Sequence, residues 1–217
     1  MTFAGLWGII VALNMDYLEF LRSNERQLKA IGADTSGPVV LEQFNPAWND
    51  DIEIMREETS KILTDNGVKF KIMLRGSMYL AGRVPNFPSK PCADMVVLTD
   101  TLGDRKKAGN ILVNTHFADK RGSHSGVFVE RNNTKLKNLH YASVTVGRYD
   151  DPRTTDMLLF PEYLLRNPRE LEIYKNVKRM LTKSETSFKD YSDKKYSFVY
   201  ACLLKAREEL SAEDIFK

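Results

Sequence analysis

The side chains best suited to chemistry lie in residues 74–98, where a glycine and a serine follow an apolar segment and a lone carboxylate comes later. Gly76 and Ser77 come directly after residues 68–74, which read as a strand. A turn of small residues can bring backbone N–H groups and a hydroxyl against a phosphate, because glycine has no Cβ to block the approach. Asp94, on the next predicted strand, could then hold a metal ion that shares the charge of the phosphate. The alternative is a strand, a tight turn and an edge carboxylate without a ligand.

Several cationic or titratable side chains are candidates for the same site. Arg75 and Lys90 flank the turn and could bind a leaving phosphate or an acidic substrate. Arg131 ends a predicted strand and could contact an anionic substrate. His140 leads the strand that we expect beside the one carrying Asp94, so it is either a ligand or base, or a histidine of the core or rim.

A lysine interrupts the apolar face of the last predicted helix. Lys195 lies in a seam of side chains spaced by three or four residues: Phe188, Tyr191, Phe198 and Cys202. An ammonium group there either reaches solvent or meets an anion, so Lys195 binds a phosphate or forms a structural salt bridge. Its neighbour Lys194 points elsewhere and serves as an internal control.

Composition narrows the class of protein. The 217 residues suffice for one mixed domain with a helical addition. Lys and Arg number 32 against 29 Asp and Glu, so no global charge demands nucleic acid or a membrane, and we expect a small-molecule substrate. The apolar residues 3–13 are too short to span a bilayer. Cys92 and Cys202 lack metal-type spacing and are expected to be buried free thiols of a cytoplasmic protein.

The order of the predicted elements indicates an α+β fold. A helical stripe in residues 16–31 looks like an addition to the domain that follows. Asn45 and Pro46 are expected to start a helix that ends at Gly67. Strands are predicted at residues 39–44, 68–74, around Asp94, and at 113–117, 126–131 and 139–146, with a helix or loop at 101–110. Asp150, Asp151 and Pro152 open a helical part, in which Phe160-Pro161 predicts a kink or break.

Several of these pieces together resemble one family. Phe44-Asn-Pro-Ala-Trp48, Gly76-Ser77, and Lys90-Pro91 followed by Asp94-Met-Val-Val resemble successive landmarks of the GrpB-like family. That family belongs to the nucleotidyltransferase superfamily, which has the polymerase-beta-like fold. The closing helices are similar as well, through Phe160-Pro-Glu-Tyr163, Tyr174 with Lys178 and Leu181, and Tyr191, Lys195 and Phe198. The resemblance spans residues 38 to 208.

The resemblance implies a fold and a division of the chain. It implies a nucleotidyltransferase-like mixed sheet flanked by helices. We expect an N-terminal helical extension at 1–37, the α/β core at 38–149, and a C-terminal helical subdomain packed on the core at 150–217.

The resemblance also implies a nucleotide-dependent reaction. ATP or another nucleoside triphosphate would lie against Gly76 and Ser77, with Lys195 as counter-charge and Asp94 holding Mg²⁺. The acceptor would be a hydroxyl, giving nucleotidyl transfer, or a carboxylate, giving an acyl-nucleotide that leads to an amide. Wider nucleotidyltransferases place a second acid two residues after the first, whereas this chain has Val96, which favours a site with one metal ion or little use of metal.

Two other classes of function stay open. One is a non-catalytic member that binds a small anion or a partner protein, which the valine at the second-acid position favours. The other is a nucleotide-independent hydrolase or cyclase that uses His140 and Asp94.

Overall fold

The protein is built on a five-stranded mixed sheet. A computed structural model describes residues 39–113, 117–120, 127–130, 136–139, 141–183 and 188–216. The strands are β1 (Lys71–Arg75), β2 (Cys92–Thr99), β3 (Phe117–Lys120), β4 (Val127–Glu130) and β5 (Tyr141–Arg148), in the order β1-β2-β5-β4-β3. The β2–β5 pair is parallel and the other neighbouring pairs are antiparallel. The α+β architecture with a mixed sheet, predicted from the sequence, is confirmed.

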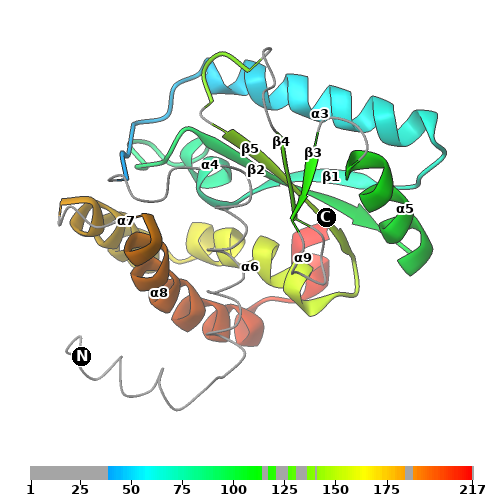
Figure 1. Cartoon of the computed structure of the whole chain (residues 1–217). Coiled ribbons are helices and arrows are strands. Elements are labelled where there is room, and N and C mark those ends of the chain that lie inside the picture. Colours follow the sequence, from blue (N-terminus) through cyan, green and yellow to red (C-terminus); the bar gives the residue numbers. More distant parts are fainter. Residues whose placement is uncertain are drawn as a thin grey trace.

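Helices cover both faces of this sheet (Figure 1). One face carries α3 (Trp48–Asp65) and α5 (Leu102–Val113), and the other carries α6 (Pro152–Arg166), α7 (Pro168–Lys183), α8 (Phe188–Glu209) and α9 (Ala212–Phe216). A short helix, α4 (Gly76–Ala81), follows β1 directly. Successive side chains of a strand point to opposite faces, so Met95 and Val97 of β2 join the first apolar cluster while Val96 and Leu98 join the second. Strand β2 is therefore apolar on both sides, as a strand between two helical layers must be.

Polar side chains and glycine set the helix boundaries. The Oδ1 atom of Asn45 accepts the backbone N–H of Ala47 at 3.0 Å, but α3 begins at Trp48 with Ala47 at its cap position and no side-chain cap, so Asn45 and Pro46 precede the helix instead of starting it. Gly67, at φ +63°, ends the same segment, as expected for a residue without a Cβ. Asp151 caps α6 by accepting the backbone N–H of Arg153 at 3.0 Å, and Pro152 occupies the first turn, where its missing N–H has no cost.

Three local predictions differ from the structure. Residues 39–44 form no strand of the sheet. In the described structure their only β-type pairing is one isolated bridge, between Glu42 and Ser89. Val113, which was predicted to start a strand, is the last residue of α5. Helix α6 runs through Pro161, so the chain does not break there, and the kink that was the other possibility stays a prediction. Buried packing on both sides of the proline offsets the one backbone hydrogen bond that it removes.

Two of the three predicted parts, residues 38–149 and 150–217, share an apolar cluster. Residues 1–37, the expected N-terminal extension, lie outside the described residues. The second apolar cluster joins Leu80, Val96 and Leu98 of the predicted core to buried residues of α6 to α9, such as Leu158 and Leu203. The division of the chain into three parts remains a prediction.

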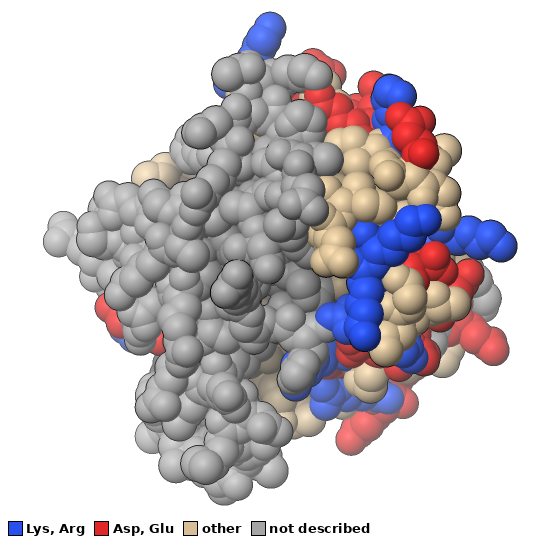
Figure 2. Space-filling model, turned by 45° about the vertical axis from the view of Figure 1, so that its right-hand side comes forward, with Lys and Arg blue, Asp and Glu red and all other residues tan. Residues whose placement is uncertain are grey.

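The distribution of surface charge and the positions of the two cysteines agree with what the composition predicts. On the face shown in Figure 2, the described basic and acidic side chains are intermixed, in keeping with a formal net charge of +3. Among the described helices, none is both long and apolar enough to cross a membrane. Cys92 and Cys202 are both buried, as predicted, and form no disulfide among the described residues.

Candidate functional site

Three neighbouring strands bring Arg75, Asp94 and Ser143 into one row. Arg75 is the register partner of Asp94 in the β1–β2 ladder, and Ser143 is its partner in the β2–β5 ladder. The Ser143 hydroxyl donates to Oδ1 of Asp94 at 2.5 Å, while Nη2 of Arg75 lies 4.0 Å from the same oxygen. Nη2 of Arg75 also donates to Oγ1 of Thr145 at 3.0 Å. The sheet thus holds the lone carboxylate between Arg75 and the hydroxyl of Ser143, and Thr145 in turn holds Arg75.

The chain turns beside this carboxylate at Gly76. Its φ is +71°, in the left-handed region where a side chain is strained. A Cβ built on Gly76 would lie 3.3 Å from Oδ2 of Asp94, closer than most Cβ contacts. The absence of a Cβ therefore lets the turn approach the carboxylate of Asp94, while the expected approach to a phosphate stays a prediction. Ser77 follows at the start of α4 and is partly exposed.

A buried lysine from the C-terminal helices reaches Ser77. Nζ of Lys178, in α7, donates to Oγ of Ser77 at 3.0 Å and also to the carbonyl of Pro88. Lys178 is 1% exposed, and its Nζ lies 4.5 Å from the centre of the Phe87 ring and 5.7 Å from that of Tyr174. The sequence prediction left this residue out of the site. The signal was available, because Tyr174, Lys178 and Leu181 share a helical face on which the other two members are apolar or aromatic.

Two further lysines lie around the ring of Tyr191. Nζ of Lys195 is 5.3 Å and Nζ of Lys90 is 6.0 Å from the ring centre, within the range of cation–π attraction. Lys195 is partly buried and Lys194 is exposed, so the helical face predicted for α8 points inward as expected. The seam around Lys195 is inward too, since Tyr191 and Cys202 are buried.

The charges of this cluster act on one another. The pKa of Lys195 is lowered to about 8, mainly by burial; the nearby charges of Lys90 and Arg75 contribute to the lowering, and Asp94 opposes it. Burial also lowers the pKa of Lys178 well below its usual range, and the charges of Lys195 and Lys90 add to that shift. The pKa of Lys90 is lowered by burial and partly restored by Asp94. These four cationic side chains and Asp94 therefore lie close enough to shift one another's pKa values, although they come from separate parts of the chain.

Two polar atoms in this region lack a partner. Among the described residues, Nε of Arg75 and the hydroxyl of Tyr191 are buried without a hydrogen bond. Buried polar groups are ordinarily paired, so each such atom needs an explanation. Both atoms can donate a hydrogen bond, and both belong to residues that border the lysine cluster, so an anion with several acceptor oxygens would satisfy them.

The family is settled by sequence. The model of the family described as GrpB protein matches residues 38–205. The chain belongs to the GrpB family. Among curated proteins, none matches this GrpB-family chain in sequence.

Solved structures support the fold of this GrpB-family protein. The crystal structure of the conserved protein GrpB from Enterococcus faecalis is similar with a TM-score of 0.61 at 20% sequence identity, over 78% of this chain and 98% of that one. The Cid1 poly(U) polymerase with bound MgGTP reaches a TM-score of 0.44 at 12% identity, over 65% of this chain and 44% of that one. A cytoplasmic RNA terminal U-transferase reaches 0.45 at 12% identity, over 77% and 47%. The likeness to the Enterococcus protein shows a shared fold, and the two weaker ones carry no argument about activity.

The family resemblance implied a magnesium ion at Asp94, and the groups around this carboxylate decide whether one fits. Mg²⁺ is usually held by one or two carboxylates together with substrate phosphates. The second-acid position, Val96, is 0% exposed in the apolar cluster, and the β5 residues beside Asp94 and Val96 are Ser143 and Thr145. No group of three or more His, Cys, Asp or Glu side chains that could hold a metal ion occurs in the part of the chain that the structure describes. With one carboxylate among four cationic side chains, this GrpB site does not fit a divalent cation.

Two predicted site residues lie outside the described structure. His140 and Arg131 are among the residues that the structure does not describe. Strand β5 nevertheless begins at Tyr141 and runs parallel beside β2, so the strand that His140 was predicted to lead does lie next to the one carrying Asp94.

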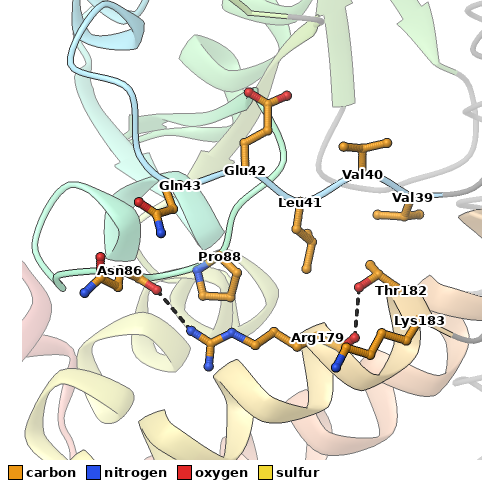
Figure 3. A pocket seen from close by; sticks show the side chains of 10 residues that line it. All are labelled: Val39, Val40, Leu41, Glu42, Gln43, Asn86, Pro88, Arg179, Thr182 and Lys183. Atoms are coloured by element: carbon orange, nitrogen blue, oxygen red, sulfur yellow. Dashed lines mark hydrogen bonds between the residues drawn. The ribbon is translucent and has the colours of Figure 1, made fainter.

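A separate cavity opens beside α7 (Figure 3). Its volume is about 460 Å³, and it lies between the extended residues 39–43 and the side chains of Arg179, Thr182 and Lys183. Arg179 donates from Nη2 to the carbonyl of Asn86 at 3.3 Å. None of the predicted site residues lines this cavity, so it is distinct from the cluster around Asp94.

Proposed function

We propose that this GrpB-family protein is a nucleotide-dependent transferase that activates a small-molecule substrate. The observation that carries the proposal is the convergence of Ser77, Asp94 and Lys195, from three distant segments, with Lys90 and Lys178 beside them. Such a donor-rich cluster suits the tail of a nucleoside triphosphate, such as ATP, because phosphate oxygens accept hydrogen bonds and carry charge.

In the proposed reaction, an acceptor oxygen attacks the α-phosphorus of the triphosphate. The bond from that phosphorus to the bridging oxygen breaks, and pyrophosphate leaves with the electron pair. The three lysines and Arg75 stabilise the charge that develops on the leaving group. A hydroxyl acceptor passes its proton to Asp94, whose carboxylate stays partly exposed at 32% of its side chain. A carboxylate acceptor has no proton to lose and forms an acyl-nucleotide that an amine can open to an amide.

His140 and Arg131 keep their predicted roles as proposals. His140 would provide a second base near the start of β5, and Arg131 would contact an anionic part of the acceptor. Each is tested by the effect of His140→Asn or Arg131→Ala on turnover and on the KM of the acceptor.

Thermal stabilisation by nucleotides tests the proposal. We expect the wild type to be stabilised by at least one nucleoside triphosphate, by about 2.7 kcal/mol when the ligand is at 100 times its Kd. Lys195→Ala should lose most of this shift, while Lys194→Ala, at the exposed neighbouring position, should keep it. The absence of a shift with all four common triphosphates would contradict the proposal.

A second function is a non-catalytic module that binds a small anion. The observation that favours it is Val96, which is sealed in the apolar core where related enzymes place an acid. Release of pyrophosphate from the stabilising triphosphate, measured with pooled hydroxyl and carboxylate acceptors, separates the two functions. Binding without any release would favour the module. Turnover that persists after rigorous removal of nucleotide would instead favour a hydrolase or cyclase built on Asp94.

A further inference from the structure

The cluster around Ser77 consists almost entirely of hydrogen-bond donors. Arg75, Lys90, Lys178 and Lys195 come from β1, the segment before β2, α7 and α8. The carboxylate of Asp94 acts on the charges of Lys90 and Lys195, whose pKa values it raises. A metal site requires the opposite chemistry, namely several acceptor oxygens that face one point.

The carboxylate itself is already engaged. Oδ1 of Asp94 accepts the hydroxyl of Ser143 at 2.5 Å and faces Arg75, and Oδ2 lies against the turn at Gly76. A divalent cation at Asp94 would also be repelled by the neighbouring ammonium groups, whereas a polyphosphate would be attracted by all of them. The buried, unpartnered Nε of Arg75 and hydroxyl of Tyr191 likewise require an acceptor.

From this geometry, and resting on the proposed triphosphate site, we infer that the lysine cluster takes the place of a divalent cation: the site binds the metal-free polyphosphate and takes up protons at Lys178 and Lys195 as the anion enters.

The protonation step follows from what surrounds each amine. Lys178 faces Ser77, Tyr174, the carbonyl of Pro88 and the charges of Lys195 and Lys90, with no described carboxylate bonded to it. Burial lowers the pKa of Lys178 well below its usual range, and the neighbouring charges of Lys195 and Lys90 lower it further, so the charged form of this amine is disfavoured when no ligand is bound. An anion placed beside it favours the charged form and raises that pKa again.

Lys195 responds in the same direction. It faces Tyr191 from its own helix, and Lys90, Asp94, Cys92 and Arg75 from the sheet side. With a pKa of about 8, it is protonated in half of the free molecules at that pH and in nearly all of them once a polyphosphate is bound. Binding is therefore linked to proton uptake.

Calorimetric titration of the full chain with inorganic tripolyphosphate tests the inference without assuming a base preference. The titration is run at pH 8 with EDTA, and again with Mg²⁺, in two buffers of different ionisation enthalpy. We expect binding in EDTA at least as tight as with Mg²⁺, and an apparent enthalpy that differs between buffers by a net proton uptake. Binding only in Mg²⁺, or binding without proton uptake, overturns the inference and leaves the proposed function standing. No binding under either condition overturns both.

Two variants sharpen the result. Asp94→Asn keeps an acceptor for Ser143 and removes the negative charge, so binding of tripolyphosphate in EDTA should be unchanged or tighter. Loss of that binding in Asp94→Asn would show that the site needs the negative charge of Asp94 and would overturn the inference. Lys195→Met should weaken binding about 10-fold or more and reduce the proton uptake. Lys194→Met, exposed on the same helix, is the matched control and should change neither quantity.

Discussion

The side-chain nitrogen of Lys178 lies 3.0 Å from the hydroxyl oxygen of Ser77, across 101 positions of sequence. This contact joins α7 to the turn after β1, so the C-terminal helices help to build the site at the sheet. Among the described residues, no carboxylate is bonded to Lys178, and the amine is buried. The stability of the folded protein therefore depends on whether the amine of Lys178 carries a proton.

The first prediction concerns the pH dependence of stability. Lys178 and Lys195 have lowered pKa values in the folded protein, whereas the unfolded chain keeps these protons up to a pKa near 10.5. The unfolded state binds more protons, so the free energy of unfolding should rise with pH between about pH 8 and pH 10. Each lysine contributes at most about 1.4 kcal/mol per pH unit. Burial raises the pKa of Tyr174 and Tyr191, so stability should fall again above about pH 10.

Urea unfolding at several pH values measures this dependence. In Lys178→Met the rise should be smaller, because one of the lysines with a lowered pKa no longer titrates. Lys183→Met replaces an exposed lysine of the same helix and should keep the full slope. An unchanged slope in Lys178→Met would contradict the prediction.

The sequence predicted the two central strands of the sheet, β2 and β5, and the inward position of Lys195, but not the role of Lys178. Alternation of β-branched residues located β5, and the apolar run after Asp94 located β2, because buried strands leave a strong hydrophobic signal. The three- and four-residue spacing around Lys195 placed its side chain on the inward face of α8. These patterns depend only on residues that are close in sequence, so the three-dimensional structure reproduces them.

The failures arose where a partner far away in sequence decides the outcome. Residues 39–44 have strand-like composition, but their only described bridge joins Glu42 to Ser89, and propensity alone cannot supply a neighbouring strand. Lys178 was overlooked because its role depends on the approach of α7 to Ser77, which no local pattern reveals. A charged residue inside an apolar helical face marked both Lys195 and Lys178, so applying that rule to every helix would have found the second lysine as well.

The second prediction concerns the turn beside Asp94. Gly76→Ala should destabilise the protein by about 1–2 kcal/mol, because φ is +71° and the new Cβ would lie 3.3 Å from Oδ2 of Asp94. Gly82→Ala is the matched control at the other end of α4, where φ is −72° and the nearest atom to the new Cβ is 3.8 Å away. It should be neutral or slightly stabilising. Denaturant midpoints of the two variants give the comparison, and equal effects would exclude a special role for Gly76.

The third prediction concerns the carboxylate that anchors the chain leading into β5. Asp51 is 2% exposed and accepts the backbone N–H groups of Lys137, Asn138 and Leu139 at 3.2, 2.7 and 2.8 Å. Asp51→Ala leaves these donors without their acceptor, which should cost about 3 kcal/mol or more. Asp50→Ala, at the exposed preceding position, should cost less than about 1 kcal/mol. A small effect of Asp51→Ala in chemical unfolding would show that water replaces the carboxylate.

The last prediction uses two buried tyrosines to separate stability from binding. The Tyr191 hydroxyl has no hydrogen-bond partner within the described structure, while the Tyr174 hydroxyl shares a hydrogen bond with Ser77. Tyr191→Phe removes a buried polar atom that has no acceptor, so the ligand-free protein should gain about 1 kcal/mol of stability. Because that hydroxyl is expected to donate to the bound anion, the same variant should bind tripolyphosphate about 10-fold more weakly.

Tyr174→Phe breaks an existing hydrogen bond and should instead lower the stability of the ligand-free protein by about 1 kcal/mol. Thermal unfolding with and without tripolyphosphate measures both effects, and a Tyr191→Phe variant that loses stability without ligand would refute the idea that its hydroxyl is kept for a ligand.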